Sequence, residues 1–230
     1  MKLQDAIVLI TGANRGIGLA FAEVALARGA RKVYAGARVP SSITTPDVVP
    51  VKLDVTSDED VADAARICAD VTLVVNNAGI ALAGGLLKAE AGEAARAQFE
   101  TNVFGMLRVT QAFAPVLAKN GGGAFLNVLS VASWINSGAM TAYAVSKAAA
   151  WSLTNGLRNE LRPQGTQVLG LHVGFVDTDL ARGLDVVKVS PQSVAVSAFD
   201  ALEAGASEVL ADERARMVKR GLTAEPAIYL

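Results

Sequence analysis

A glycine-rich turn near the start of the chain constrains its fold more than any other feature. An apolar run ends at Thr11, and a helical pattern follows within a few residues. The turn between them reads Gly12-Ala13-Asn14-Arg15-Gly16-Ile17-Gly18. Glycines let a backbone approach a pyrophosphate, and the start of a helix supplies free N–H donors and a positive dipole end. The turn therefore predicts a nucleotide-phosphate site, although the glycines could also serve the turn alone.

Short apolar runs alternate with alanine-rich helical stretches along the chain. Most runs are apolar throughout, which is typical of strands buried on both faces of a parallel sheet. We expect one α/β domain over residues 1–230, a Rossmann-type doubly wound fold whose seven-stranded parallel sheet has helices on both faces. The expected strands are Ala6–Thr11, Lys32–Ala37, Val48–Leu53, Val71–Val75, Gly123–Leu129, Gln167–Val173 and Glu208–Ala211, and the expected helices are Gly16–Arg28, Ser57–Ala69, Glu93–Ala118, Thr141–Arg162 and Gln192–Ala204.

The composition argues against several classes of protein. The 21 Lys and Arg residues nearly balance the 22 Asp and Glu residues, so no strong basic field is available for nucleic acid or an anionic membrane. One Cys and one His cannot build a disulfide or a metal site. The first residues lack the pattern of a signal peptide, and the uncharged stretch 121–146 is too polar to span a bilayer. We expect a cytoplasmic protein without a metal, a membrane or a nucleic-acid partner.

Three further motifs follow the glycine turn in order: Asp54-Val55, Asn76-Asn77-Ala78-Gly79 and Tyr143-x3-Lys147. Together with Thr11-Gly12-x3-Gly16-x-Gly18 they resemble the short-chain dehydrogenase/reductase family, from about residue 6 to residue 180. The resemblance implies an oxidoreductase that moves a hydride between nicotinamide and a carbonyl or alcohol. It also implies that Asp54 binds the adenine amino group, with a backbone contact from Val55, and that Asn76, Ala78 and Gly79 flank the adenosine ribose. Alternatively, Asp54 caps the next helix, a role that Ser57 could also fill.

The end of the second strand indicates which cofactor the chain prefers. An NAD enzyme usually places an acidic residue there to accept the ribose hydroxyls, but this strand ends in Ala37 and Arg38. The guanidinium of Arg38 suits a 2′-phosphate, and Arg15 could hold its other side. We therefore expect NADP(H), with solvated surface charges as the alternative for both arginines.

Tyr143 and Lys147 stand four residues apart in an expected helix, so both project from one face. A free tyrosine has a pKa near ~10, and a neighbouring ammonium favours the phenolate, so we expect Lys147 to lower the pKa of Tyr143. In the family that the chain resembles, this tyrosine is the general acid for reduction and the general base for oxidation. The lysine also holds the nicotinamide ribose.

Two more polar residues complete the expected catalytic set. Ser130 matches the family's serine that polarises the substrate oxygen, and Ser133 is the alternative. Asn102 interrupts a helical run, where its amide competes for backbone partners. The resemblance implies that Asn102 holds a water that links Lys147 to solvent, with a simple helix kink as the other interpretation.

The sixth strand leads into Val173-Gly174-Phe175-Val176-Asp177-Thr178. Similar family members have Pro-Gly here, so Val173 departs from the pattern. The resemblance implies that Val176 and Thr178 contact the nicotinamide carboxamide, and we expect His172 to be structural. The substrate should lie between the nicotinamide and a largely apolar wall, which favours a small to medium ketone, aldehyde or secondary alcohol. The expected substrate contacts are Ser130, Trp134, Tyr143 and Phe175, with Ile135 and Leu180 beside them.

The helix that carries Tyr143 also predicts self-association. Ala148-Ala149-Ala150-Trp151 forms a flat surface beside one aromatic side chain, and similar proteins pair this helix across a two-fold axis. We expect a homodimer or homotetramer. A non-catalytic NADP(H) sensor or scaffold is the alternative function, since a fold does not determine an activity.

Overall fold

The computed structural model describes residues 1–88 and 91–230. Its seven strands form one sheet in the order β3-β2-β1-β4-β5-β6-β7, and every neighbouring pair is parallel. The expected seven-stranded parallel sheet is therefore confirmed, with strand ends within one or two residues of the expected ones. The strands are β1 (Ile7–Thr11), β2 (Lys32–Ala37), β3 (Val49–Lys52), β4 (Leu73–Asn76), β5 (Ala124–Val128), β6 (Gln167–His172) and β7 (Glu208–Leu210).

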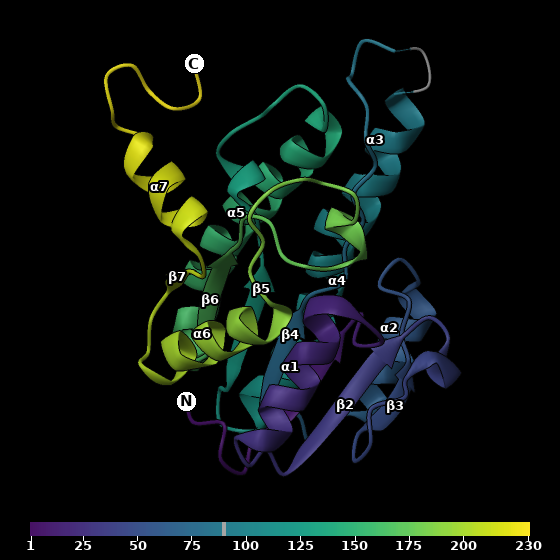
Figure 1. The fold of residues 1–230 in the computed structure, drawn as a ribbon. Helices are drawn as coiled ribbons and strands as arrows, with labels where there is room; N and C mark the ends of the chain where they lie inside the picture. Colours follow the sequence, from purple (N-terminus) through teal and green to yellow (C-terminus); the bar gives the residue numbers. More distant parts are fainter. Residues whose placement is uncertain (89–90) are drawn as a thin grey trace.

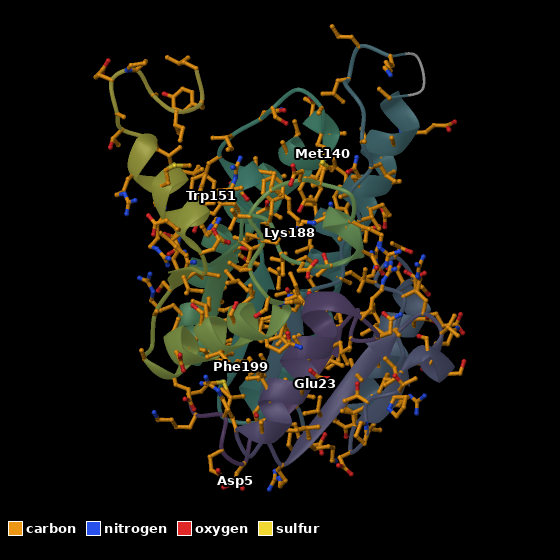
Figure 2. All side chains as sticks on the ribbon, viewed as in Figure 1. Asp5, Glu23, Met140, Trp151, Lys188 and Phe199 are labelled. Carbon is orange, nitrogen blue, oxygen red and sulfur yellow. The ribbon has the colours of Figure 1, made fainter. Side chains whose placement is uncertain are left out.

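Helices cover both faces of the sheet, as Figure 1 shows. On one face, α1 and α6 pack beside each other, and the buried side chains of Phe21 and Phe199 meet edge to face at 5.2 Å between ring centres. Phe199 is labelled beside α1 in Figure 2. The helices α2, α4 and α5 bury a second core against the other face. Over the described residues the α-helices are α1 (Gly16–Ala27), α2 (Asp58–Ile67), α3 (Ala91–Phe99), α4 (Met106–Lys119), α5 (Thr141–Leu161), α6 (Pro191–Glu203) and α7 (Glu213–Gly221).

Helix boundaries follow local chemistry. Ser57 caps α2, because its hydroxyl accepts a hydrogen bond from the backbone N–H of Asp60 at 3.1 Å. One expected helix, 93–118, is instead three elements: α3, the π-helical segment η2 (Glu100–Gly105) and α4. The interruption falls at Asn102, where the sequence predicts one. The sequence pattern did not predict α7, which follows β7 beside the C-terminal end of the chain (Figure 1).

Within residues 1–88 and 91–230, the structure contains no helix whose length and hydropathy would suit it to crossing a membrane.

Phe21→Ala should destabilise the protein by about 3–5 kcal/mol, because it removes a fully buried ring and leaves a cavity between α1 and α6. Equilibrium unfolding in urea measures the change. Val187→Ala is the control, since Val187 is 93% exposed and should shift the free energy of unfolding by less than about 0.5 kcal/mol. Equal effects of the two substitutions would contradict the packing described here.

Candidate active site

The glycine turn closes tightly over the carboxyl end of β1. Gly12 and Gly16 have φ angles of +66° and +56°, which favour glycine. A Cβ on Gly18 would overlap the carbonyl oxygen of Gly12 and lie 2.6 Å from Nδ2 of Asn77. Asn14 lies in this turn and Ile17 in the first turn of α1. The backbone therefore needs glycine here for close packing, independently of any ligand.

The start of α1 is open to an anion. Its N-cap residue, Arg15, makes no capping hydrogen bond with its side chain, and the first turn contains no acidic residue. Uncapped N–H groups and the positive end of the helix dipole favour a phosphate at this position. The turn and the helix start therefore fit the diphosphate of a dinucleotide.

Thr11 and Asn77 fasten the glycine turn to the segment after β4. The hydroxyl of Thr11 accepts hydrogen bonds from the backbone N–H groups of Asn77 and Ala78, at 3.0 and 2.9 Å. Nδ2 of Asn77 donates to the carbonyl oxygens of Thr11 and Gly12 at 2.9 and 3.1 Å. Both residues belong to the sequence motifs described above, but their contact with each other was not predicted. A polar pair after two strands that turn out to be neighbours was the available signal.

Asn76 belongs to a buried network of side-chain hydrogen bonds at the edge of the sheet where β4 and β5 end. Its Nδ2 donates to Asn127 Oδ1 at 2.9 Å and to Thr110 Oγ1 at 3.3 Å, and Nδ2 of Asn127 donates to Thr154 at 3.1 Å. All four side chains are at most 4% exposed. The contacts of Asn76 stabilise β4 against β5 and their covering helices.

Asn102 joins three segments through its amide. Its Oδ1 accepts from the N–H of Ile80 at 2.8 Å, and its Nδ2 donates to the carbonyl of Ile80 and to Ser146 Oγ at 2.9 and 3.0 Å. A Cβ on Gly79 would lie 3.1 Å from Asn102 Oδ1 and 3.7 Å from Lys147 Nζ. The π-helical kink thus brings Asn102, Gly79 and Lys147 together.

Lys147 is a buried cation with a single protein acceptor in the described structure. Its side chain is 5% exposed, and Nζ donates to the carbonyl oxygen of Val128 at 2.9 Å. Burial lowers the pKa of Lys147 to about 8. Nζ lies 5.8 Å from the centre of the Tyr143 ring.

The expectation that Lys147 lowers the pKa of Tyr143 is wrong for this structure. Burial raises the pKa of Tyr143, and a side-chain hydrogen bond with Ser130 opposes this shift. The ammonium of Lys147 donates to the carbonyl oxygen of Val128, and desolvation is the larger of the two effects on Tyr143, so the phenolate is disfavoured.

The two candidate serines differ in their contacts. Ser133 Oγ donates to the backbone carbonyl of Lys147 at 3.0 Å, so it ties η3 (Val131–Ser133) to α5. Ser130 Oγ accepts from the N–H of Ala132 at 3.1 Å, and its hydroxyl hydrogen remains free to turn toward Tyr143 or a substrate oxygen. The contacts favour Ser130 as the polarising group.

The residues expected to contact the adenosine, Asp54, Val55 and Arg38, differ in their own contacts. Oδ1 of Asp54 accepts from the N–H and hydroxyl of Thr56 at 2.9 and 2.8 Å, so Asp54 shapes the turn while Ser57 caps α2. The carbonyl of Val55 accepts from Arg108 at 2.8 Å. Arg38 is exposed after β2, and its side chain makes no ion pair within the described residues.

Arg15 forms an ion pair in this structure, and the sequence did not predict its partner. Its Nη1 lies 3.0 Å from Oδ2 of Asp179, at the start of η5 (Asp179–Ala181). The two side chains are 70% and 45% exposed, so the pair is held mainly in solvent. Arg182 also pairs with Asp179.

The segment after β6 approaches the glycine turn. A Cβ on Gly16 would lie 3.2 Å from Cγ2 of Thr178. Val176 is 5% exposed and forms an isolated parallel bridge with Val189. Thr178 and Val176 thus border the same edge as Gly16, while the loop containing Lys188 passes in front of it (Figure 2).

Trp134 packs in a cluster of side chains between η3, β6 and α7, and its contact with a substrate stays a prediction. Its ring stacks on His172 at 3.9 Å, meets Trp151 edge to face at 6.2 Å and lies 4.7 Å from the ammonium of Lys219. These neighbours pack against the Trp134 ring, and Ile135 packs in the same cluster against α7. His172 is fully buried, in agreement with a structural role. The ring of Phe175 lies under the guanidinium of Arg214, 4.8 Å from its carbon, outside that cluster.

Comparison with known proteins agrees with this geometry. The family model for short chain dehydrogenase matches residues 6–186, and the chain belongs to this family of oxidoreductases. An uncharacterized oxidoreductase from Staphylococcus saprophyticus is 30% identical over 219 residues, which cover 88% of this chain and 93% of that protein.

Two solved structures illustrate the range of the similarity. A short chain dehydrogenase from Burkholderia cenocepacia in complex with NADP superposes with a TM-score of 0.94 at 40% identity, covering 98% of this chain and 96% of that one. A 7α-hydroxysteroid dehydrogenase complexed with NADH and 7-oxo glycochenodeoxycholic acid has a TM-score of 0.82 at 25% identity, covering 91% and 93%.

The buried ammonium gives a pH-dependent prediction. The pKa of Lys147 is about 8 in the fold against 10.5 as its ordinary value, so the unfolded chain binds more protons between these limits. The free energy of unfolding of the native chain should therefore rise relative to that of Lys147→Met by roughly 2 kcal/mol between pH 8 and pH 10. Urea unfolding of both proteins across this range measures it, and parallel pH profiles would contradict the assignment.

Proposed function

We propose that the chain catalyses NADP(H)-dependent interconversion of a carbonyl and an alcohol, with Tyr143 as general acid and base. The convergence of Asn102, Gly79 and Lys147 beside the Tyr143 ring carries this proposal. All of these groups lie at the edge where the glycine turn leaves an anion site at α1. The proposal therefore joins a dinucleotide site to a proton-transfer site.

The residues divide the work between binding and proton transfer. A bound nicotinamide supplies or accepts the hydride. The N–H groups at the start of α1 would hold the diphosphate, and Val176 and Thr178 would contact the carboxamide. Asp54 and Val55 would contact the adenine, and the segment from Asn76 to Gly79, including Ala78, would flank the adenosine ribose.

The phenol of Tyr143 donates its proton to the substrate oxygen during reduction and takes one back during oxidation. Ser130 holds that oxygen by a hydrogen bond. Lys147 would hold the hydroxyls of the nicotinamide ribose through its ammonium. Asn102 fixes the segment around Gly79 against α5 and supports the water that connects Lys147 with solvent. Burial raises the pKa of Tyr143, so its phenol stays protonated near neutral pH and has a proton to give.

The cofactor preference depends on Arg38 and Arg15. Arg38 is exposed at the end of β2, where a carboxylate would be needed to favour NAD. Arg15 must exchange Asp179 for the 2′-phosphate. A phosphate carries more negative charge than a carboxylate and offers three acceptor oxygens, so it competes with Asp179 for the guanidinium of Arg15. The NADP complex of the similar B. cenocepacia protein supports this preference, while the NADH complex of the steroid dehydrogenase makes its test necessary.

The substrate is proposed to be a small to medium apolar ketone, aldehyde or secondary alcohol. Phe175 and the exposed Leu180 supply apolar surface near the site. We also propose that the protein is cytoplasmic and assembles as a homodimer or homotetramer.

Tyr143→Phe should retain NADPH binding and lose turnover by about 10²–10⁴-fold, because only the transferable proton is removed. Absorbance of NADPH, followed over a panel of apolar carbonyls, measures the rate. Tyr229→Phe, at an exposed position near the C-terminal end, is the matched control and should keep the native rate. A Tyr143→Phe rate above half the native value on every active substrate would remove Tyr143 from the mechanism. NADPH binding without any turnover would favour a sensor.

Replacing Ala37 with Asp and Arg38 with Leu should shift the ratio of kcat/KM for NADPH and NADH by roughly 100-fold or more toward NADH. The change removes charge-assisted hydrogen bonds and adds a carboxylate that repels phosphate. Both values are measured on one carbonyl at moderate salt. Arg31→Leu, before the opposite end of β2, is the control and should leave the ratio unchanged. A native preference for NADH would contradict the assignment of Arg38.

A further inference from the structure

A buried carboxylate joins the turn after β6 to the C-terminal helix. Oδ2 of Asp212 accepts a hydrogen bond from the N–H of Gly174 at 2.6 Å, and Oδ1 accepts one from the N–H of Ala215 at 2.7 Å. The residue is only 5% exposed. The second bond caps α7, but the first leaves the helix entirely and reaches a segment 38 residues earlier.

The charge of Asp212 is stabilised by backbone groups. No lysine or arginine side chain forms a salt bridge with it within the described residues. A buried carboxylate is costly unless donors satisfy its oxygens, and hydrogen bonds to a charged acceptor are shorter and stronger than neutral ones. The Gly174 N–H is therefore held firmly, and Asp212 cannot release it without losing charge stabilisation.

The same turn packs directly on the start of α7. A Cβ on Gly174 would lie 3.0 Å from Oδ1 of Asp212 and 3.1 Å from both Cβ and Cδ of Arg214. The guanidinium of Arg214 lies over the Phe175 ring, 4.8 Å from its centre. Two consecutive turn residues are thus held by two residues at the start of α7.

Other hydrogen bonds connect this turn with the catalytic segments. The carbonyl of Val173 accepts from the N–H of Val131 at 2.9 Å, next to Ser130. On the far side, the carbonyl of Phe175 accepts from the N–H of Val189 at 3.0 Å. A displacement of Gly174 would therefore move Phe175 and disturb the link to the segment that carries Ser130.

We propose that Asp212 is a positioning residue for the reaction, acting through Gly174 on the turn that presents Phe175, Val176 and Thr178. The inference rests on the proposed function, because that function places these three residues beside the nicotinamide and the substrate. Arg214 assists by holding the Phe175 ring. The start of α7 is therefore part of the catalytic apparatus, although it contributes no group to the reacting atoms.

Two substitutions separate this role from helix capping. Asp212→Ser retains a good N-cap for α7 but is too short to reach Gly174. Asp212→Asn can keep Oδ1 on Ala215 while its amide turns a donor toward the Gly174 N–H. Val218→Ala is the matched control, because Val218 is 1% exposed in α7 and its loss weakens helix docking without touching the turn.

Three measurements are made on each variant: hydrogen exchange of the Gly174 amide, the Kd for NADPH by fluorescence titration, and kcat/KM with NADPH. Small misplacements near reacting atoms cost up to about 100-fold. In Asp212→Ser and Asp212→Asn, the amide hydrogen of Gly174 should exchange faster with solvent. Both variants should bind NADPH several-fold more weakly and have a kcat/KM that is lower by roughly 10–100-fold. Val218→Ala should lower Tm while keeping both kinetic and binding constants within about two-fold.

Gly174→Ala tests the same contact from the other side. Its added Cβ would press on Asp212 and Arg214, so it should reproduce the kinetic loss without removing the cap of α7. Both substitutions break the same contact. The loss of kcat/KM in the double variant Asp212→Ser with Gly174→Ala should therefore be little larger than in either single variant. Fully additive losses would overturn the proposal.

The remaining outcomes distinguish the inference from the proposed function. Native Kd and kcat/KM in both Asp212 variants would overturn the positioning role, as would an equal kinetic loss in Val218→Ala. An unchanged rate of exchange of the Gly174 amide would show that the hydrogen bond from Gly174 to Asp212 does not hold the turn, and would overturn the proposal. A native protein that binds neither NADPH nor NADH would instead refute the proposed function. The exchange measurement would still report on the hydrogen bond between Gly174 and Asp212.

Discussion

All seven strands run in the same direction, and this constraint brings the whole candidate site to one edge of the sheet. Parallel neighbours require crossover connections, so the carboxyl ends of the strands face the same side. The order of strands reverses between β1 and β4, and a crevice at such a reversal is where open α/β sheets bind ligands. Thr11 ends β1, Asn77 directly follows β4, and the two residues form hydrogen bonds across the reversal. Their contact therefore holds the glycine turn in place.

The same edge concentrates polar groups that the core must satisfy. The buried chain through Asn76, Asn127 and Thr154 gives each amide a partner, as buried polar groups require. Lys147 is less well compensated, since one carbonyl oxygen receives its ammonium and burial lowers its pKa to about 8. Burial also raises the pKa of Tyr143. Desolvation thus disfavours the charged form of both residues, and a ligand that adds charge or hydrogen bonds here changes both protonation equilibria.

The sequence predicts the fold well because the fold depends on local patterns. Continuous apolar runs predicted each strand to within two residues, and Ser57 with Asp60 predicted the start of α2. Asn102 correctly marked an interruption, but the pattern could not distinguish a kink from the six-residue π-helical segment that is present. The helix α7 was missed because its charged exposed face hides its two buried positions, Ala215 and Val218.

Side-chain partners were harder to predict because they depend on contacts between distant segments. Trp134 follows β5 closely in sequence, yet its ring turns toward His172 on the neighbouring strand and toward α7. Arg15 meets Asp179 164 residues later, and Gly174 meets Asp212 38 residues later. In each case the residue type was compatible with several partners, and packing selected one. Family resemblance identifies groups that face a shared cofactor, but contacts such as Asp212 with Gly174 depend on how the C-terminal segment of this chain packs against the turn after β6.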